Sequence, residues 1–177
     1  MTTTTIPEFG IYVACLAAYN NGQLHGEWID ATQDPEDIKA EVSAMLAASP
    51  QPNAEEWAIH DYSLGGIEIG EWESFSTVSL IANAIQEHGE AFVAFYNDGG
   101  LNADNSDEWG DMFTDSYRGE YSSMADYAES LCNDCYDMRD VPEWVKGHID
   151  WESMGREMEA DCWTAESDSG VYVFSRC

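Results

Sequence analysis

The spacing of hydrophobic residues in the first third of the chain predicts three strands. Residues Phe9 to Ala18 are apolar, β-branched and aromatic, which is typical of a buried strand. The turn-forming residues Tyr19 to Gly22 follow, and Glu27 to Asp30 then alternate as a returning strand does. Residues Glu56 to Tyr62 have the composition of a third strand. We therefore expect a three-stranded antiparallel sheet near the N-terminus.

A helix is predicted between the second and third of these strands. Asp34 and Pro35 suit its N-cap and first position, and apolar residues recur after them at helical spacing. The Pro-containing stretch at 49–52 ends it. Its water-facing side carries Glu36, Asp37 and Glu41. Residues 1–62 are thus expected to form an N-terminal β-β-α-β domain.

Residues 63–104 are expected to form a small helical middle domain. A Gly-rich stretch at 63–70 begins it, and a helix is predicted from about Ser76 to His88, with Gly89 as its C-terminal stop. Residues Glu90 to Tyr96 are compatible with a short helix or a strand, and we favour the helix.

Residues 105–177 are expected to form a C-terminal α+β domain. Helices are predicted from near Ser106, from Glu120 to Met138 and from about Asp150 to Asp161, before a closing strand at Val171 to Phe174. The residues expected to point inward from the first and last of these helices are Trp109, Met112, Phe113 and Tyr117, and Trp151, Met154 and Met158. The predicted fold class is α+β, arranged as an elongated chain of three small domains.

The helix predicted from Glu120 to Met138 separates apolar from acidic residues most completely. At 100° per residue its apolar face holds Met124, Tyr127, Ala128, Leu131, Cys135 and Met138. Ser123 and Asp126 have the spacing of a capping box. The opposite side carries Asp126, Glu129, Asn133 and Asp137, with Asp134 on the flank. Because no Lys or Arg occurs from Glu120 to Met138, this face lacks the mixed charges that usually support a surface helix.

The acidity extends over the whole sequence. The 177 residues include 35 Asp and Glu but only 6 Lys and Arg, which gives a formal net charge of −29. A hydrophobic content of 44% is enough for folded cores, so the acids do not form a disordered tail. Such a charge argues against nucleic acid or an anionic membrane as a ligand. It leaves three explanations: binding a basic surface, competing with a polyanion, or stability in high salt.

Targeting signals and membrane spans are not visible in the sequence. Residues 1–7 have neither the basic nor the apolar region of a signal peptide, and no apolar run approaches the length of a membrane-spanning helix. Five cysteines without a secretory signal favour reduced thiols in a cytosol. We therefore expect a cytoplasmic protein.

Several residue groups resemble reactive or metal sites, but none carries an enzyme signature. Cys132 and Cys135 have the spacing of half a zinc site, yet neighbouring carboxylates raise a thiol pKa, and we favour core cysteines. His25 and His60 lie near carboxylates and are more consistent with structural roles than with metal ligation. We expect no catalytic residue, no metal and no cofactor.

The distribution of the acids suggests what the protein imitates. Duplex DNA carries one charge per ~1.7 Å of its axis, so a charge of −29 corresponds to roughly 50 Å of duplex. On the helix after Ser123, acids three to five residues apart are separated by ~4.5–7.5 Å along the axis, on the order of phosphate spacing. These observations lead to the hypothesis of a protein mimic of DNA. The acids that would form the mimic are Glu36, Asp37, Glu41, Asp107, Glu108, Asp111, Asp115, Asp126, Glu129, Asp134, Asp137, Glu152, Glu159 and Asp161.

Several segments resemble the ArdA family of antirestriction proteins. The clearest are YNNGQLHGEWID at 19–30 and AEEWAIHDY at 54–62. Further similarity lies at 87–95 (EHG followed by AFVAF), at 117–121 (YRGEY), at 127–129 (YAE) and at 171–174 (VYVF). The segments occur in the expected order over most of the chain.

The resemblance implies a fold and a function. ArdA proteins are carried on mobile elements and inhibit type I restriction–modification enzymes by imitating bent B-form DNA in their DNA-binding groove. They are elongated homodimers of three-domain subunits whose C-terminal domains make the dimer contact. The family's antirestriction motif is expected at 127–136. The resemblance therefore implies a non-enzymatic protein in the cytoplasm of a bacterial host, with no membrane contact and no direct binding of nucleic acid.

Two other interpretations compete with the mimic. A halophilic protein would also have an acidic surface and few lysines, but it should unfold in low salt. A carboxylate- or metal-dependent hydrolase should melt at a higher temperature in saturating divalent metal.

Overall fold

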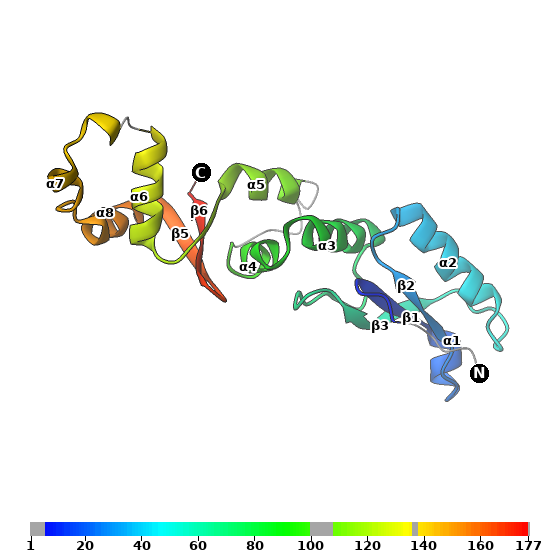
Figure 1. Ribbon diagram of the computed structural model, residues 1–177. Helices are drawn as coiled ribbons and strands as arrows, with labels where there is room; N and C mark the ends of the chain where they lie inside the picture. The colour runs from blue at the N-terminus through cyan, green and yellow to red at the C-terminus, as the bar shows by residue number, and fades with distance from the viewer. Residues whose placement is uncertain (1–5, 100–107, 136–137, 177) are drawn as a thin grey trace. The chain divides into compact units, whose positions relative to one another are not determined.

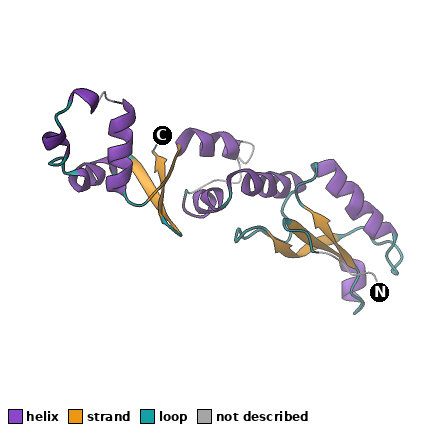
Figure 2. Ribbon diagram, in the orientation of Figure 1, coloured by secondary structure: helices purple, strands orange, loops and turns teal. Residues whose placement is uncertain are grey.

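The computed structural model describes residues 6–99, 108–135 and 138–176 (Figure 1). The chain divides into two compact units, Met1–Asp107 and Glu108–Cys177. Each unit combines helices with a three-stranded antiparallel sheet, as Figure 2 shows by colour. The predicted α+β class is confirmed.

The sheet of the first unit has the strand order β2-β1-β3. The strands are β1 (Gly10–Cys15), β2 (Gly26–Asp30) and β3 (Trp57–Ser63), and both neighbours pair antiparallel to β1. Alternate residues of the central strand, such as Ile11 and Val13, are fully buried. Helix α2 (Pro35–Ala47) begins at the predicted Asp34 cap and buries Ile38, Val42 and Met45. The N-terminal sheet and its helix are confirmed.

The expected first strand is too long, because it ends at Cys15 and a short helix follows. Helix α1 (Leu16–Asn20) occupies the segment that was predicted to be the end of a strand and a tight turn. The Asn21 side chain donates to the Ala17 carbonyl at 2.8 Å, and Gly22 then takes a positive φ of 73°. The Asn-Gly pair thus ends a helix and does not form a two-residue hairpin turn.

Two helices complete the first unit. Helix α3 (Phe75–His88) is capped by Ser74, whose Oγ accepts from the Thr77 amide at 3.1 Å. Gly89, with φ 61°, joins it to α4 (Glu90–Asp98), so the helix favoured at 90–96 is confirmed. Helix α3 is held to the segment before α2, because Ser79 Oγ donates to the Gln33 carbonyl at 2.7 Å. The subdivision at residue 62 stays a prediction.

The sheet of the second unit has the order β4-β6-β5. Strand β6 (Gly170–Ser175) was predicted, whereas β4 (Tyr117–Tyr121) and β5 (Cys162–Ser167) were not. In β4 a glycine with a φ of 121°, Gly119, interrupts a polar sequence. Strand β5 contains few consecutive apolar residues and follows a helix. Both strands gain their order by pairing with the buried β6, an interaction that local patterns do not encode.

The described residues of the second unit also include five short helical segments. They are α5 (Trp109–Ser116), α6 (Met124–Cys135), the 3-10 helix η2 (Met138–Asp140), α7 (Glu143–Lys146) and α8 (Trp151–Met158). Helix α6 is shorter than predicted at its N-terminal end, because Tyr117–Tyr121 is strand. Residues 136–137, within the rest of the predicted helix, lie outside the described residues.

The core between α6, α8 and the sheet explains which predicted inward residues are buried. Tyr127, Cys162 and Val173 form its centre, with the partly buried Met124, Leu131 and Met158 packed against them. Two inward predictions are wrong: Cys135 is exposed in the last turn of α6, and Met112 of α5 is 39% exposed. A third residue, Tyr117, is only half-buried and begins β4.

Candidate functional site

The candidate site is a set of exposed acidic side chains on ordered elements. Of the fourteen acids predicted to form it, Asp107 and Asp137 lie outside the described residues, and the other twelve are all exposed. The same holds more widely, since every other described Asp and Glu is exposed except Glu73, which is half-buried. Both units therefore present carboxylates to solvent, as the cost of burying an unpaired charge requires.

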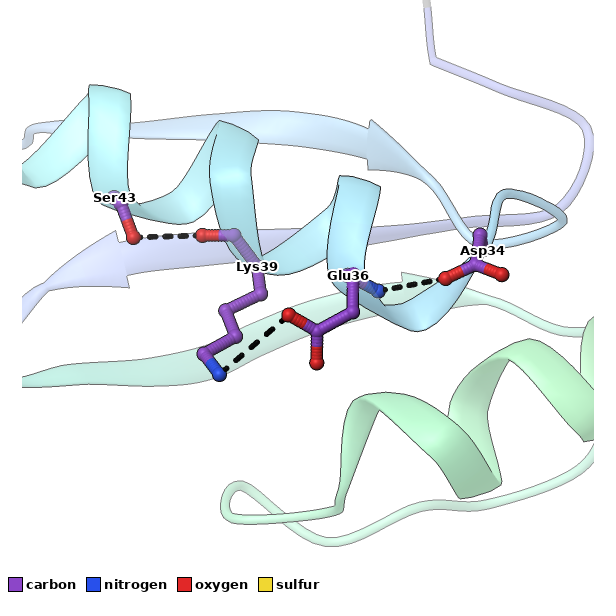
Figure 3. Close-up of polar contacts among 4 residues, drawn as sticks. All are labelled: Asp34, Glu36, Lys39 and Ser43. Carbon is purple, nitrogen blue, oxygen red and sulfur yellow. Dashed lines mark hydrogen bonds and ion pairs between the residues drawn. The ribbon is translucent and has the colours of Figure 1, made fainter.

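Helix α2 shows how its acidic face is built (Figure 3). Asp34 Oδ1 accepts from the Glu36 amide at 3.0 Å and so fixes the first turn. The Lys39 Nζ lies 3.7 Å from Glu36 Oε2, so a positive charge lies beside the Glu36 carboxylate in this exposed pair. Asp37 and Glu41 follow Glu36 by one and five residues, and both are exposed on the same helix.

Helix α6 uses one of its predicted site acids to fix its own start. Asp126 Oδ2 accepts from the Ser122 amide at 3.3 Å and from Ser122 Oγ at 3.1 Å, while the Asp126 amide donates to Ser123 Oγ at 3.2 Å. The predicted capping box is thus present, although the carboxylate reaches the amide of Ser122 and not that of Ser123. Glu129 and Asp134 are exposed further along the helix.

Helix α8 is brought against α6 by a glycine. A Cβ at Gly155 would lie 2.7 Å from the Met124 carbonyl carbon and oxygen, so only glycine permits this approach of the two backbones. Glu152 is exposed on α8 and lies 4.0 Å from Arg156 NH1, whereas Glu159 is its C-cap. Asp161, predicted inside the helix, lies beyond its end.

Sequence reasoning missed several exposed acids of the second unit. Glu120 was assigned to a helix but lies on β4, and Ser169 Oγ donates to its Oε1 at 2.7 Å. The hydroxyls of Ser167 and Ser169 lower the pKa of the Glu120 carboxyl. Glu143 and Glu157 are also exposed on α7 and α8. The signal that could have found them was acidity at outward helical positions, which the sequence shows for both helices.

The few cations do little to neutralise this surface. Lys39, Lys146 and Arg156 each pair with a glutamate three or four residues earlier in their own helix. Arg118 NH2 donates to Ser175 Oγ at 2.8 Å, and Arg176 Nε donates to the Cys162 carbonyl at 2.9 Å. The pairing is therefore local, and most of the carboxylates keep their charge facing solvent.

The cysteines and histidines that resembled metal or reactive sites in the sequence have other surroundings in the structure. Over residues 6–99, 108–135 and 138–176, no group of three His, Cys, Asp or Glu side chains is placed to hold a metal ion. Cys132 is half-buried and Cys135 exposed, so the expectation of two core cysteines is wrong for the second. His25 Nε2 lies 2.8 Å from the Met45 carbonyl oxygen, and His60 packs edge-on against Tyr19 at 4.8 Å, which are structural contacts.

The comparisons with known proteins assign the chain to a family. Within the described residues, none of the helices has the length and apolar character needed to cross a membrane. A search of curated proteins gave no match. The sequence profile described as "Antirestriction protein (ArdA)" matches residues 11–173, which is nearly the whole chain and spans both compact units. The protein therefore belongs to the ArdA family of antirestriction proteins.

Proposed function

We propose that this protein inhibits type I restriction–modification enzymes by occupying their DNA-binding groove as a mimic of B-form DNA. Membership of an antirestriction family makes inhibition of restriction the expected activity. The mimicry, the partner and the contact residues are our inference. The protein would thereby protect incoming mobile DNA in the cytoplasm of a bacterial host, without acting as an enzyme.

One observation carries the proposal: the acids are exposed on folded helices in both units and few cations accompany them. A flexible acidic tail would have to be ordered on binding, and the loss of its conformational entropy would weaken association. Carboxylates fixed on helices avoid most of that cost. They also release bound counterions when they meet a basic groove, as DNA phosphates do.

A homodimer would double the length of duplex whose charge the proposed mimic matches. One chain of −29 corresponds to roughly 50 Å of duplex, and two chains, with twice that charge, to roughly 100 Å. We therefore propose a homodimer with its contact in the C-terminal unit, as the resemblance to the family implies.

The acids act as a set in this proposal. We define the α6 acid set as Asp126, Glu129 and Asp134 of α6 together with Asp137, which lies outside the described residues. The exposed acids of the other helices named above are proposed to act in the same way. No single acid is expected to be indispensable, because a basic groove is attracted by the summed charge of many carboxylates and not by one side chain. Glu36 and Glu152 contribute least, since each has a cation within 4.0 Å.

The test is competition for a purified type I enzyme. Labelled duplex DNA is bound to the enzyme and titrated with this protein at two salt concentrations. Displacement that weakens as salt rises is expected, because counterion release drives the association. No displacement at low salt, by protein shown to be folded there, would refute the proposal.

The halophilic alternative is tested in the same samples. A halophilic protein loses its fold at low salt, where repulsion between its acids is least screened. Circular dichroism of the protein at the lower salt concentration distinguishes the two, since a DNA mimic must be folded under the conditions in which it binds most tightly.

A further inference from the structure

One cleft of the first unit has aromatic walls and an acidic rim. It has a volume of about 530 Å³, within the range of protein ligand pockets, and is lined by Leu16, Glu55, Glu56, Trp57 and Trp72. Trp57 is half-buried, whereas Trp72 remains 64% exposed. An indole left so open at a concave surface next to two exposed carboxylates is unusual for a residue whose role is packing alone.

Backbone contacts hold the walls of this cleft in place. The Leu16 amide donates to the Glu56 carbonyl at 3.0 Å, and the Ile59 amide donates to the Glu71 carbonyl at 2.9 Å. The second bond places the segment with Trp72 along strand β3, which is an edge strand of its sheet. The cleft is therefore formed before any partner arrives.

The tryptophan rings are also fixed by aromatic contacts. Trp57 stacks on Phe75, the first residue of α3, with 4.5 Å between ring centroids and 23° between planes. The Trp72 ring lies 6.3 Å from that of Trp57 at 47°. Phe75 covers one face of Trp57 and the two indoles contact each other, so the aromatic surface left open to a group in the cleft is mainly that of Trp72.

These features point to a cationic occupant. The faces of indole rings attract cations, and tryptophan does so most strongly of the aromatic side chains. Glu55 and Glu56 add negative charge at the same opening. Within residues 1–107 the one Lys or Arg is Lys39, which lies 3.7 Å from Glu36.

We infer that the cleft receives an arginine side chain of the restriction enzyme, a contact that rests on the proposed function and adds to its charge mimicry. A planar guanidinium stacks on an indole face while donating to carboxylates, which an ammonium group does less well. DNA-binding grooves are rich in arginines that otherwise contact phosphates. Such an arginine gains in this cleft an aromatic contact that the phosphate backbone of DNA does not provide.

The binding chemistry is tested first without the enzyme. The indole N–H signals of Trp57 and Trp72 are followed by NMR in the full chain during titration with N-acetyl-arginine amide at low salt. N-acetyl-citrulline amide, which has nearly the same shape without the charge, is the control ligand. Both signals are expected to shift with the arginine ligand only, and the Trp57 shift should be lost in Trp72→Ala. Equal shifts with both ligands, or none, would overturn the inference.

The competition assay then tests whether the enzyme uses the cleft. Trp72→Ala should weaken displacement of DNA about 5- to 30-fold, the factor expected for a partly desolvated cation–π contact. Trp72→Phe, which keeps an aromatic face, should retain most of the activity. Leu24→Ala removes a 77% exposed apolar side chain from the same unit and should have no effect.

The two proposals fail in different ways. If the wild-type protein displaces DNA and Trp72→Ala does so equally well, the arginine contact is refuted and the mimicry stands. If the wild-type protein displaces no DNA, the proposed function fails, and so does the assignment of the arginine to a restriction enzyme. The indole titration then still decides whether the cleft binds a guanidinium.

Discussion

Replacing Gly155 by alanine should destabilise the C-terminal unit, although alanine is the better helix former. The new Cβ would lie 2.7 Å from the carbonyl carbon and oxygen of Met124 and 2.9 Å from the Ala125 amide nitrogen. All three are backbone atoms at the start of α6, so no side chain can turn away to make room. Helix α8 must move instead.

The size of the movement follows from the same distances. Ordinary contact begins at 3.4 Å and the nearest atoms lie at 2.7 Å, so the helices must separate by about 0.7 Å at their crossing. That shift loosens Met158 of α8 against the core formed by Tyr127, Cys162 and Val173. Overpacking of this kind costs about 1–3 kcal/mol, and the gain in helix propensity offsets up to about 1 kcal/mol of it. Because all three overlapping atoms are backbone, the cost lies in the upper half of that range, and we expect a net loss of about 1–2 kcal/mol.

Gly110→Ala is the matched control. Gly110 also lies in a helix of this unit, α5, but a Cβ there would meet nothing within 4 Å. That variant should be neutral or stabilised by up to about 1 kcal/mol. Calorimetry of the full-length variants measures the difference, and hydrogen exchange of the α6 and α8 amides locates it. A Gly155→Ala protein as stable as Gly110→Ala would show that the two helices are not held at this crossing.

Three further predictions concern charge and core. Neutralising the α6 acid set together, with Asn and Gln, should weaken inhibition and flatten its salt dependence, while single changes cost little; unchanged inhibition by the folded quadruple variant would exclude this face as a contact. Leu131→Asp should cost about 3 kcal/mol or more by placing a charge against the core and should unfold the unit, seen as loss of its near-UV circular dichroism. Glu120 has a lowered pKa in the folded state, so the stability it adds is complete above the ordinary pKa of 4.5 and is lost as pH falls through the lowered value. Glu120→Gln should therefore be less stable than wild type at neutral pH and should approach it in acid, and a gap that stays constant with pH would contradict this.

The parts of the fold that local chemistry determines could be predicted from the sequence. Helix α2 is defined by its Asp34 cap, its Pro35 start and its apolar spacing, and α3 ends at Gly89 as expected. Strands β4 and β5 could not be predicted in this way. Their residues are polar or irregular in pattern, and they are strands because β6 lies between them.

The errors at helix ends have a related cause. Cys135 and Met112 continue the apolar stripes of α6 and α5, but both side chains are exposed in the structure. Periodicity reports which face of a helix is apolar, and it does not report how far the core beneath it extends. The position of α8 is likewise set by the close approach at Gly155, for which the sequence offers only a glycine inside an otherwise helical pattern.

That the acids are exposed could be predicted from the composition alone. An ionised carboxylate without a partner is too costly to bury, and a chain with 35 acids and 6 cations cannot supply partners, so almost any fold of it exposes its acids. Exposure alone therefore does not distinguish a DNA mimic from another acidic protein. The proposed mimicry requires in addition that the acids are held at fixed separations, and contacts such as the Ser122 cap on Asp126 and the close approach of α8 to α6 at Gly155 restrict the helices that carry them. A binding groove shaped for the fixed spacing of phosphates can use a rigid array of this kind, and stability in salt requires no such rigidity.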